Sequence, residues 1–180
     1  MMTETSRQFE QAIAMCKEVF VNKMKDYGSS WRILRTSSLT DQIYIKANRI
    51  RSIEQKGIQK IDEGVRPEFI GIVNYSVMAL IQLELGIEGN LDLPEKEAMT
   101  LYEKHLYGAR DLMLNKNHDY DEAWRNMRVS SYTDIILMKL KRIKQIEDKE
   151  GETLVSEGVD ANYRDIINYA LFALIKIEVD

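Results

Sequence analysis

The residues best suited to chemistry in this chain of 180 residues are two pairs of cations at helical spacing. Lys46 and Arg49 are three residues apart, and Lys139 and Arg142 repeat that spacing. Residues three apart share one side of a helix, so each pair stands together beside an apolar stripe. Phosphate suits such a pair, because Arg offers a planar set of donors and Lys a point charge. The spacing predicts a phosphate-binding position in each half of the chain.

Loop arginines precede both predicted helices and would extend this phosphate grip: Arg32, Arg35, Arg125 and Arg128. The cations have a second interpretation, because Asp26 and Asp41 also recur at equivalent positions in the other half. In that interpretation, carboxylates and cations form an ion-pair network that fixes the loop against the helices. The sequence leaves both interpretations open.

Aromatic and amide side chains complete the candidate nucleotide-binding set. Trp124 follows the loop and offers either a ring on which a base stacks or a plug for the core. Asn168 and Tyr169 stand inside a strongly apolar helix, where an amide needs a hydrogen-bond partner. That partner is either a neighbouring helix or a ligand.

Four acidic residues of the second half are candidates for one metal site: Glu147, Glu150, Asp160 and Asp165. The two glutamates lie one turn apart near the end of a predicted helix, and the two aspartates open the next one. Antiparallel packing would bring these ends together, and converging carboxylate oxygens suit Mg²⁺. The alternative is structural, because the helix dipole favours acidic residues at helix N-termini whatever the function.

The first half has lost part of this acidic pattern. Gly57 stands at the position of Glu150, and Gly71 stands at the position of Asp165. We therefore predict an asymmetric molecule in which any active site is built mainly from the second half.

An internal repeat determines how these residues are positioned. Residues 26–56 and 119–149 share 16 identities in 31 positions at a constant offset of 93. After one inserted residue the similarity continues at an offset of 94, so that Asn74 and Tyr75 align with Asn168 and Tyr169. The chain is a tandem duplication, and residues 1–86 and 95–180 form its two copies.

Apolar residues at helical spacing predict three helices in each copy and no strands. Ser38 with Asp41 and Ser131 with Asp134 predict the start of each second helix, and Pro67 is expected in the first turn of a third. Residues 87–94 predict a linker, because glycine and proline interrupt the periodicity there. We expect an all-α bundle of two three-helix repeats packed as a pseudo-dimer, and a further homodimer is compatible with it.

Composition limits the functions that this chain can have. A net charge of −4 argues against an extensive nucleic-acid surface, although a local basic pocket is compatible with it. Cys16 is the only cysteine, which fits a reducing cytoplasm and excludes an intrachain disulfide. No targeting sequence or run of about 18 uncharged apolar residues is present, so we expect a cytoplasmic protein without a membrane partner.

The Asp-Tyr-Gly turn at Asp26, the spacing of Asp41, Lys46 and Arg49, and the Asp-Ile-Ile-Asn-Tyr-Ala segment at 165–170 carry a family resemblance. The chain resembles the nucleotide modification associated domain family of bacteria and phages, in two tandem copies. It is more distantly similar to the MazG-type all-α nucleoside triphosphate pyrophosphohydrolases, which are dimeric helical bundles.

The MazG resemblance implies Mg²⁺ held by an E-x-x-E pair and an E-x-x-D pair, and cleavage of NTP to NMP and pyrophosphate. Glu147-x-x-Glu150 matches the first pair, whereas the second reads Asn162-x-x-Asp165 and lacks its leading acid. We therefore expect a nucleotide-binding protein of MazG-like fold whose partner is a nucleotide or nucleotide-like small molecule, either as an Mg²⁺-dependent NTP pyrophosphohydrolase or without catalysis. The alternative is a non-catalytic interaction module associated with nucleotide or nucleic-acid modification.

Overall fold

The computed structural model describes residues 2–57, 61–120, 122–149 and 158–179. These residues form helices joined by irregular segments, and no strand is found among them. Three α-helices per copy are found, as predicted, and a short 3₁₀ helix follows the first helix of each. In chain order the elements are α1 (Glu4–Tyr27), η1 (Ser30–Ile33), α2 (Thr36–Lys56), α3 (Ile61–Leu85), α4 (Glu95–Tyr120), η2 (Ala123–Asn126), α5 (Val129–Asp148) and α6 (Val159–Val179).

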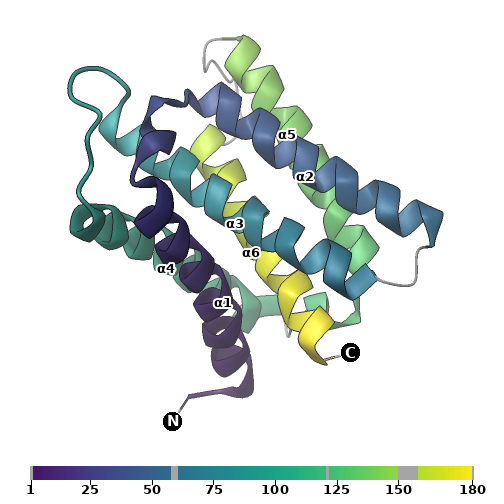
Figure 1. The fold of residues 1–180 in the computed structure, drawn as a ribbon. Helices are drawn as coiled ribbons and strands as arrows, with labels where there is room; N and C mark the ends of the chain where they lie inside the picture. The colour runs from purple at the N-terminus through teal and green to yellow at the C-terminus, as the bar shows by residue number, and fades with distance from the viewer. Residues whose placement is uncertain (1, 58–60, 121, 150–157, 180) are drawn as a thin grey trace.

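The helices pack in pairs that join the two copies (Figure 1). The third helices, α3 and α6, lie side by side at the centre, with α2 and α5 on one side and α1 and α4 on the other. Helix α1 contacts α6 of the other copy as well as α3 of its own, and α4 likewise contacts both α3 and α6. The copies therefore share one core, and the predicted all-α bundle with pseudo-dimer packing is confirmed.

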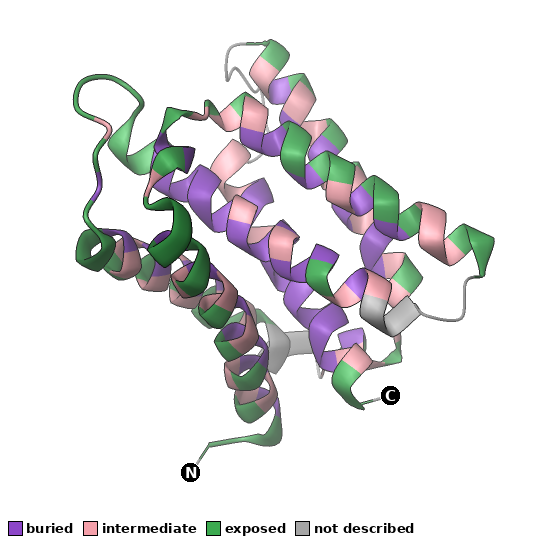
Figure 2. Ribbon diagram, in the orientation of Figure 1, coloured by how far each residue is buried: buried purple, intermediate pink, exposed green. Residues whose placement is uncertain are grey.

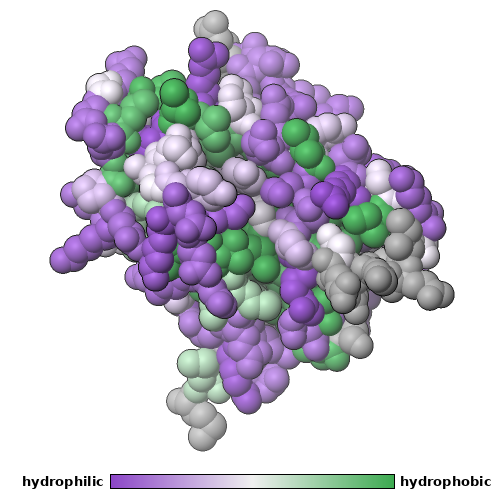
Figure 3. Space-filling view, viewed as in Figure 1, coloured by the Kyte–Doolittle hydropathy of each residue, from purple (hydrophilic) through white to green (hydrophobic). Residues whose placement is uncertain are grey.

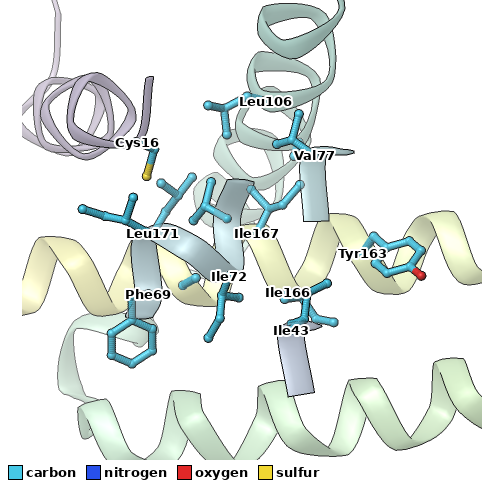
Figure 4. Close-up of a cluster of buried hydrophobic side chains, with 14 of the residues drawn as sticks. Cys16, Ile43, Phe69, Ile72, Val77, Leu106, Tyr163, Ile166, Ile167 and Leu171 are labelled. Atoms are coloured by element: carbon cyan, nitrogen blue, oxygen red, sulfur yellow. The ribbon is translucent and has the colours of Figure 1, made fainter. Parts of the chain in front are cut away.

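The central helices are buried along most of their length (Figure 2). They are the most apolar segments of the sequence, so their position follows from the free energy gained when apolar surface leaves water, about 1.5–3 kcal/mol for a large aliphatic side chain. Figure 4 shows side chains from α1, α2, α4 and both central helices meeting in this core. Cys16, Ile43, Leu106 and Ile166 are each 0% exposed.

Reciprocal hydrogen bonds relate the two copies by an approximate two-fold axis. The Thr40 hydroxyl donates to the Glu147 carboxylate at 3.3 Å, and the Thr133 hydroxyl donates to Glu54 at 3.2 Å. These four residues are two pairs of equivalents in the repeat, so each copy makes the same contact with the other. Burial raises the pKa of both Glu54 and Glu147 above the ordinary value for glutamate.

Reciprocal ion pairs follow the same symmetry on the outer surface of α2 and α5. Asp41 pairs with Lys144 at 3.4 Å, and Asp134 pairs with Arg51 at 3.9 Å. Both aspartates thus contact cations of the other copy. The two helices must run antiparallel, because each pair joins the start of one helix to the end of the other.

Three predicted helix starts are wrong by a few residues. Helix α2 begins at Thr36 and α5 at Val129, with Arg35 and Arg128 as N-caps and no side-chain capping hydrogen bond, so Ser38 and Ser131 lie inside the first turn. Helix α3 begins at Ile61, which places Pro67 inside the helix rather than in its first turn. Packing of the apolar faces outweighs the local capping preferences at these ends.

One helical segment, Gly64–Leu85 in α3, is long and apolar enough to cross a membrane. The most apolar window of this segment is 72% buried inside the bundle.

Candidate functional site

The two candidate lysines form ion pairs with the central helix of their own copy. The Lys46 ammonium lies 3.4 Å from one oxygen of Glu68, and the Arg49 guanidinium lies 3.4 Å from the other. In the second copy, Lys139 lies 2.9 Å from Asp165. Both lysines therefore have protein carboxylates as partners, although these carboxylates are not the aspartates that the sequence suggested.

Two of the loop arginines hold the fold together. Arg32 is 5% exposed and donates to the Gln82 side chain and to the Gly86 carbonyl. Arg125 donates to Thr5 at 2.8 Å and to Gln8 at 2.7 Å, and thereby fastens η2 to α1 of the other copy. The donors that the sequence analysis assigned to phosphate therefore bond to protein groups in both arginines.

The remaining candidate cations lie nearer to solvent. Arg35 and Arg128 are exposed at the N-termini of α2 and α5, and Arg142 is half-buried on α5. None of these three arginines lines a pocket that the structure describes.

Two polar residues near the ends of the central helices have a structural role that the sequence analysis did not predict. Gln82 donates to the Arg32 and Leu34 carbonyls at 2.8 and 2.6 Å, and Lys176 donates to the Arg125 and Met127 carbonyls at 2.8 and 2.5 Å. Gln82 and Lys176 occupy the same position of the repeat and satisfy the carbonyls of η1 and η2. The sequence contains a signal for these two residues, because both copies keep a polar residue at this one position of an apolar helix.

Trp124 lies in the core. It is 6% exposed and stacks on Phe172 with ring centroids 4.5 Å apart and an angle of 11° between the planes. The Arg125 guanidinium covers its ring at 4.4 Å from the centroid. Because both neighbours come from the chain itself, no described face of this ring is left for a base.

The amide of Asn168 bonds to neighbouring helices. Its nitrogen donates to the Ala109 carbonyl at 2.9 Å and to the Arg164 carbonyl at 3.1 Å. Its side-chain oxygen is buried and has no hydrogen-bond partner among the described residues. Tyr169 packs near Tyr132 and Phe172, and burial raises the pKa of its hydroxyl.

The acidic residues proposed for Mg²⁺ have separate partners. Glu147 accepts from Thr40 of the first copy, Asp165 pairs with Lys139, and Asp160 pairs with Arg164 at 3.0 Å. Glu150 lies outside the described residues. Within the part of the chain that the structure describes, no three Asp, Glu, His or Cys side chains come together as a metal site would require.

A cavity of about 370 Å³ lies in the first copy, between α1, η1, α2 and α3; we call it the first-copy cavity. Figure 3 shows apolar side chains at the surface between α1 and α3, surrounded by hydrophilic ones. The apolar lining of the cavity comprises Val19, Phe20, Met24, Trp31, Pro67, Ile70, Gly71 and Met78. The polar lining of the cavity comprises Lys23, Lys46, Arg66, Glu68, Asn74 and Tyr75. A floor of apolar and aromatic side chains with a few polar groups is typical of small-molecule sites.

Gly71 shapes the wall of this cavity. A Cβ atom at that position would lie 2.6 Å from the Cδ and Cε atoms of Lys46, so the aliphatic stem of Lys46 occupies the space beside the glycine. The ammonium group then reaches Glu68 and lies 5.8 Å from the centroid of the Tyr75 ring. Gly71 therefore places a cation, a carboxylate and an aromatic ring together at the cavity.

The second copy has larger side chains at two positions equivalent to residues of the cavity lining. Phe172 replaces Met78 and stacks on Trp124, whereas Trp31 lies 6.4 Å from Phe20, centroid to centroid. Asp165 replaces Gly71 and adds a carboxylate that binds the equivalent lysine. The acid that the first copy lacks at position 71, which the sequence presented as damage to a metal site, is replaced by a glycine that accommodates the stem of Lys46.

The match to a known family falls on both copies. The model of the family described as nucleotide modification associated domain 1 matches residues 23–83 and 116–177. The chain belongs to this family. Each matched segment runs from the end of the first helix of a copy to near the end of its third helix, so the family domain is one copy of the repeat.

Most of the lining of the first-copy cavity lies inside the first matched segment. No curated protein and no solved structure matches the chain. The expected likeness to MazG-type enzymes therefore stays a prediction.

Proposed function

We propose that this protein binds a nucleotide or a nucleotide-like small molecule in the first-copy cavity. The observation that carries the proposal is the cavity itself, about 370 Å³ with an aromatic and aliphatic floor and with Lys23, Lys46 and Arg66 in its lining. Ligand pockets begin at about 300 Å³, which is enough for a base and part of its sugar. Membership of a family named for nucleotide modification supports the same ligand class.

The charges of the lining suit a ligand with an apolar body and an anionic end. Lys23, Lys46 and Arg66 contribute three positive charges, and Glu68 is the one carboxylate among the described lining residues. The base would contact Phe20 and the apolar floor, and the phosphate would lie at the cations. Arg66 pairs with Glu178 at 2.7 Å, whereas Lys46 lies at a longer distance, 3.4 Å, from Glu68, so Lys23 and Lys46 are the cations better placed to turn to a ligand.

A panel of nucleoside monophosphates, triphosphates and deoxynucleotides tests the proposal by thermal shift. A ligand at about 100 times its Kd raises the free energy of unfolding by roughly 2.7 kcal/mol. We expect at least one nucleotide to stabilise the wild-type protein. A panel without any stabilising nucleotide would contradict the proposal.

Closing the cavity gives a sharper test. The double substitution Gly71→Asp and Met78→Phe gives the first copy the residues that the second copy has at these positions. The reverse pair, Asp165→Gly and Phe172→Met, is the matched control, because it changes the same residue types in the other copy. We expect the first variant to lose the thermal shift given by nucleoside monophosphates and the control to retain it.

A more specific form of the proposal is that the protein also hydrolyses the nucleotide that it binds. Mg²⁺-dependent cleavage of an NTP to NMP and pyrophosphate rests on the partial acidic pattern in the sequence, because Glu147 and Asp165 bond to Thr40 and Lys139 and neither lines the first-copy cavity. Pyrophosphate release with and without Mg²⁺ tests it. Nucleotide binding without release would leave a binding protein, and failure of both assays together with a co-purifying partner would favour the interaction module.

A further inference from the structure

A second groove lies on the approximate two-fold axis, between the antiparallel helices α2 and α5. We call it the axial groove. It has a volume of about 330 Å³ and contains three cations, Arg51, Lys141 and Lys144, together with Tyr44 and Asn48. None of its lining residues belongs to the first-copy cavity.

The charge of the chain is unevenly distributed around this groove. Helices α2 and α5 carry eight Lys and Arg residues against five Asp and Glu residues, although the whole chain has a net charge of −4. No carboxylate is among the described residues that line the groove. The resulting positive potential along the axis favours an anion.

Two of the three groove cations form long ion pairs with described residues. Arg51 lies 3.9 Å from Asp134, and Lys144 lies 3.4 Å from Asp41, whereas charge-assisted hydrogen bonds are about 2.7–2.9 Å long. The side chains of both aspartates are more than half exposed, at 62% and 65%. Pairs of this kind contribute little to stability, so an incoming anion can take over the cations at small cost.

We propose that the axial groove binds a ligand that carries two or three linked phosphates. Three cations from two helices match the charge of a phosphate chain better than that of a single phosphate. The near symmetry of the lining supports this, because Arg51 and Lys144 are equivalents in the repeat and would approach the chain from opposite helices. Tyr44, 41% exposed and covered on one side by Lys144 at 4.5 Å, leaves room for a base beside the phosphates.

Titration calorimetry with inorganic tripolyphosphate at low ionic strength tests the proposal. The variant Arg51→Gln with Lys144→Gln removes two groove cations, and its matched control, Lys56→Gln with Lys149→Gln, removes an equivalent pair of the repeat outside the groove. We expect the groove variant to weaken binding by about tenfold or more and the control by about twofold or less. Equal weakening by both variants would overturn the proposal.

A third variant and a competition arm complete the test. Lys141→Glu reverses one groove charge without breaking either ion pair. If the double variant fails to fold, weaker tripolyphosphate binding by Lys141→Glu supports the proposal and unchanged binding overturns it. Retention of tripolyphosphate binding by the closed-cavity variant is expected, and its loss there would place the phosphate chain at the first-copy cavity instead. Competition by an NTP or by a short single-stranded oligonucleotide distinguishes a nucleotide from a nucleic-acid backbone as the source of the phosphates.

Discussion

The hydrogen bond between Tyr102 and Asn74 offers a direct test of the pseudo-symmetric core. The Tyr102 hydroxyl on α4 donates to the Asn74 side-chain oxygen at 2.7 Å, and the Asn74 amide donates to the Cys16 carbonyl on α1 at 3.0 Å. Asn168 makes the equivalent bond to the Ala109 carbonyl. Its oxygen has no partner among the described residues, since Phe9, which has no hydroxyl, is the equivalent of Tyr102.

The substitution Tyr102→Phe removes one buried hydrogen bond and leaves the Asn74 oxygen without its donor. Tyr102 is 0% exposed, so water cannot replace the lost hydroxyl. An unsatisfied buried acceptor costs about 1–3 kcal/mol. For a chain of this size that loss lowers the Tm by roughly 2–12 °C, at about 2–4 °C for each kcal/mol.

Urea unfolding followed by circular dichroism measures this loss. Tyr107→Phe on the same helix is the control, because Tyr107 is only half-buried and contacts Arg110 through its ring rather than through its hydroxyl. We expect the control to stay within about 0.5 kcal/mol of wild type. The substitution Phe9→Tyr should in turn give Asn168 a donor. A Tyr102→Phe variant as stable as the control would refute this account of the core.

Two further predictions concern the ends of the repeat and its interface. Gln82→Ala and Lys176→Ala should each destabilise the fold by about 1–3 kcal/mol, because two loop carbonyls lose their donor. Thermal unfolding measures this loss, and the exposed substitution Lys96→Ala is the control. Burial raises the folded-state pKa of Glu54 and Glu147, so their stabilising contribution is present at acid pH and is lost as the pH rises through that pKa. The double variant Glu54→Gln with Glu147→Gln should therefore gain stability relative to wild type as the pH rises above about 4.5, the ordinary pKa of glutamate. A pH-independent difference between the two proteins would show that these carboxylates are not linked to folding.

The repeat made the architecture predictable from the sequence. Sixteen identities in 31 positions imply two equivalent units, and units with broad apolar faces bury them against each other. The helix starts were less predictable, because Ser38 and Ser131 have good capping chemistry but lie inside helices that packing extends to Thr36 and Val129. Local preferences of about 1 kcal/mol yield to tertiary contacts.

The candidate site was predictable only in part. The sequence correctly grouped Lys46 with Arg49, yet their shared partner, Glu68, lies on the next helix, and the sequence does not say which residue of that helix faces them. The lining of the first-copy cavity includes Gly71 and Met78, where the second copy has Asp165 and Phe172. Such differences produce a cavity only in the packed structure.

Arg32, Arg125 and Trp124 show the limit of reading function from retained residues. Both copies keep these residue types, and the sequence could not distinguish a structural from a ligand-binding reason for keeping them. In the structure, Arg32 and Arg125 bond to protein groups and Trp124 stacks on Phe172. Retention in both copies here reflects the fold that both copies share, whereas the cavity lies where the copies differ.

The stoichiometry of nucleotide binding tests the central claim most directly. Titration calorimetry with a nucleoside monophosphate, which lacks the linked phosphates that the axial groove is proposed to bind, should give one ligand per chain at the first-copy cavity, since Phe172 and Asp165 occupy the equivalent place in the second copy. The variant with Gly71→Asp and Met78→Phe should show no binding at that site. Two equal sites per chain, or unchanged binding after the cavity is closed, would contradict the account.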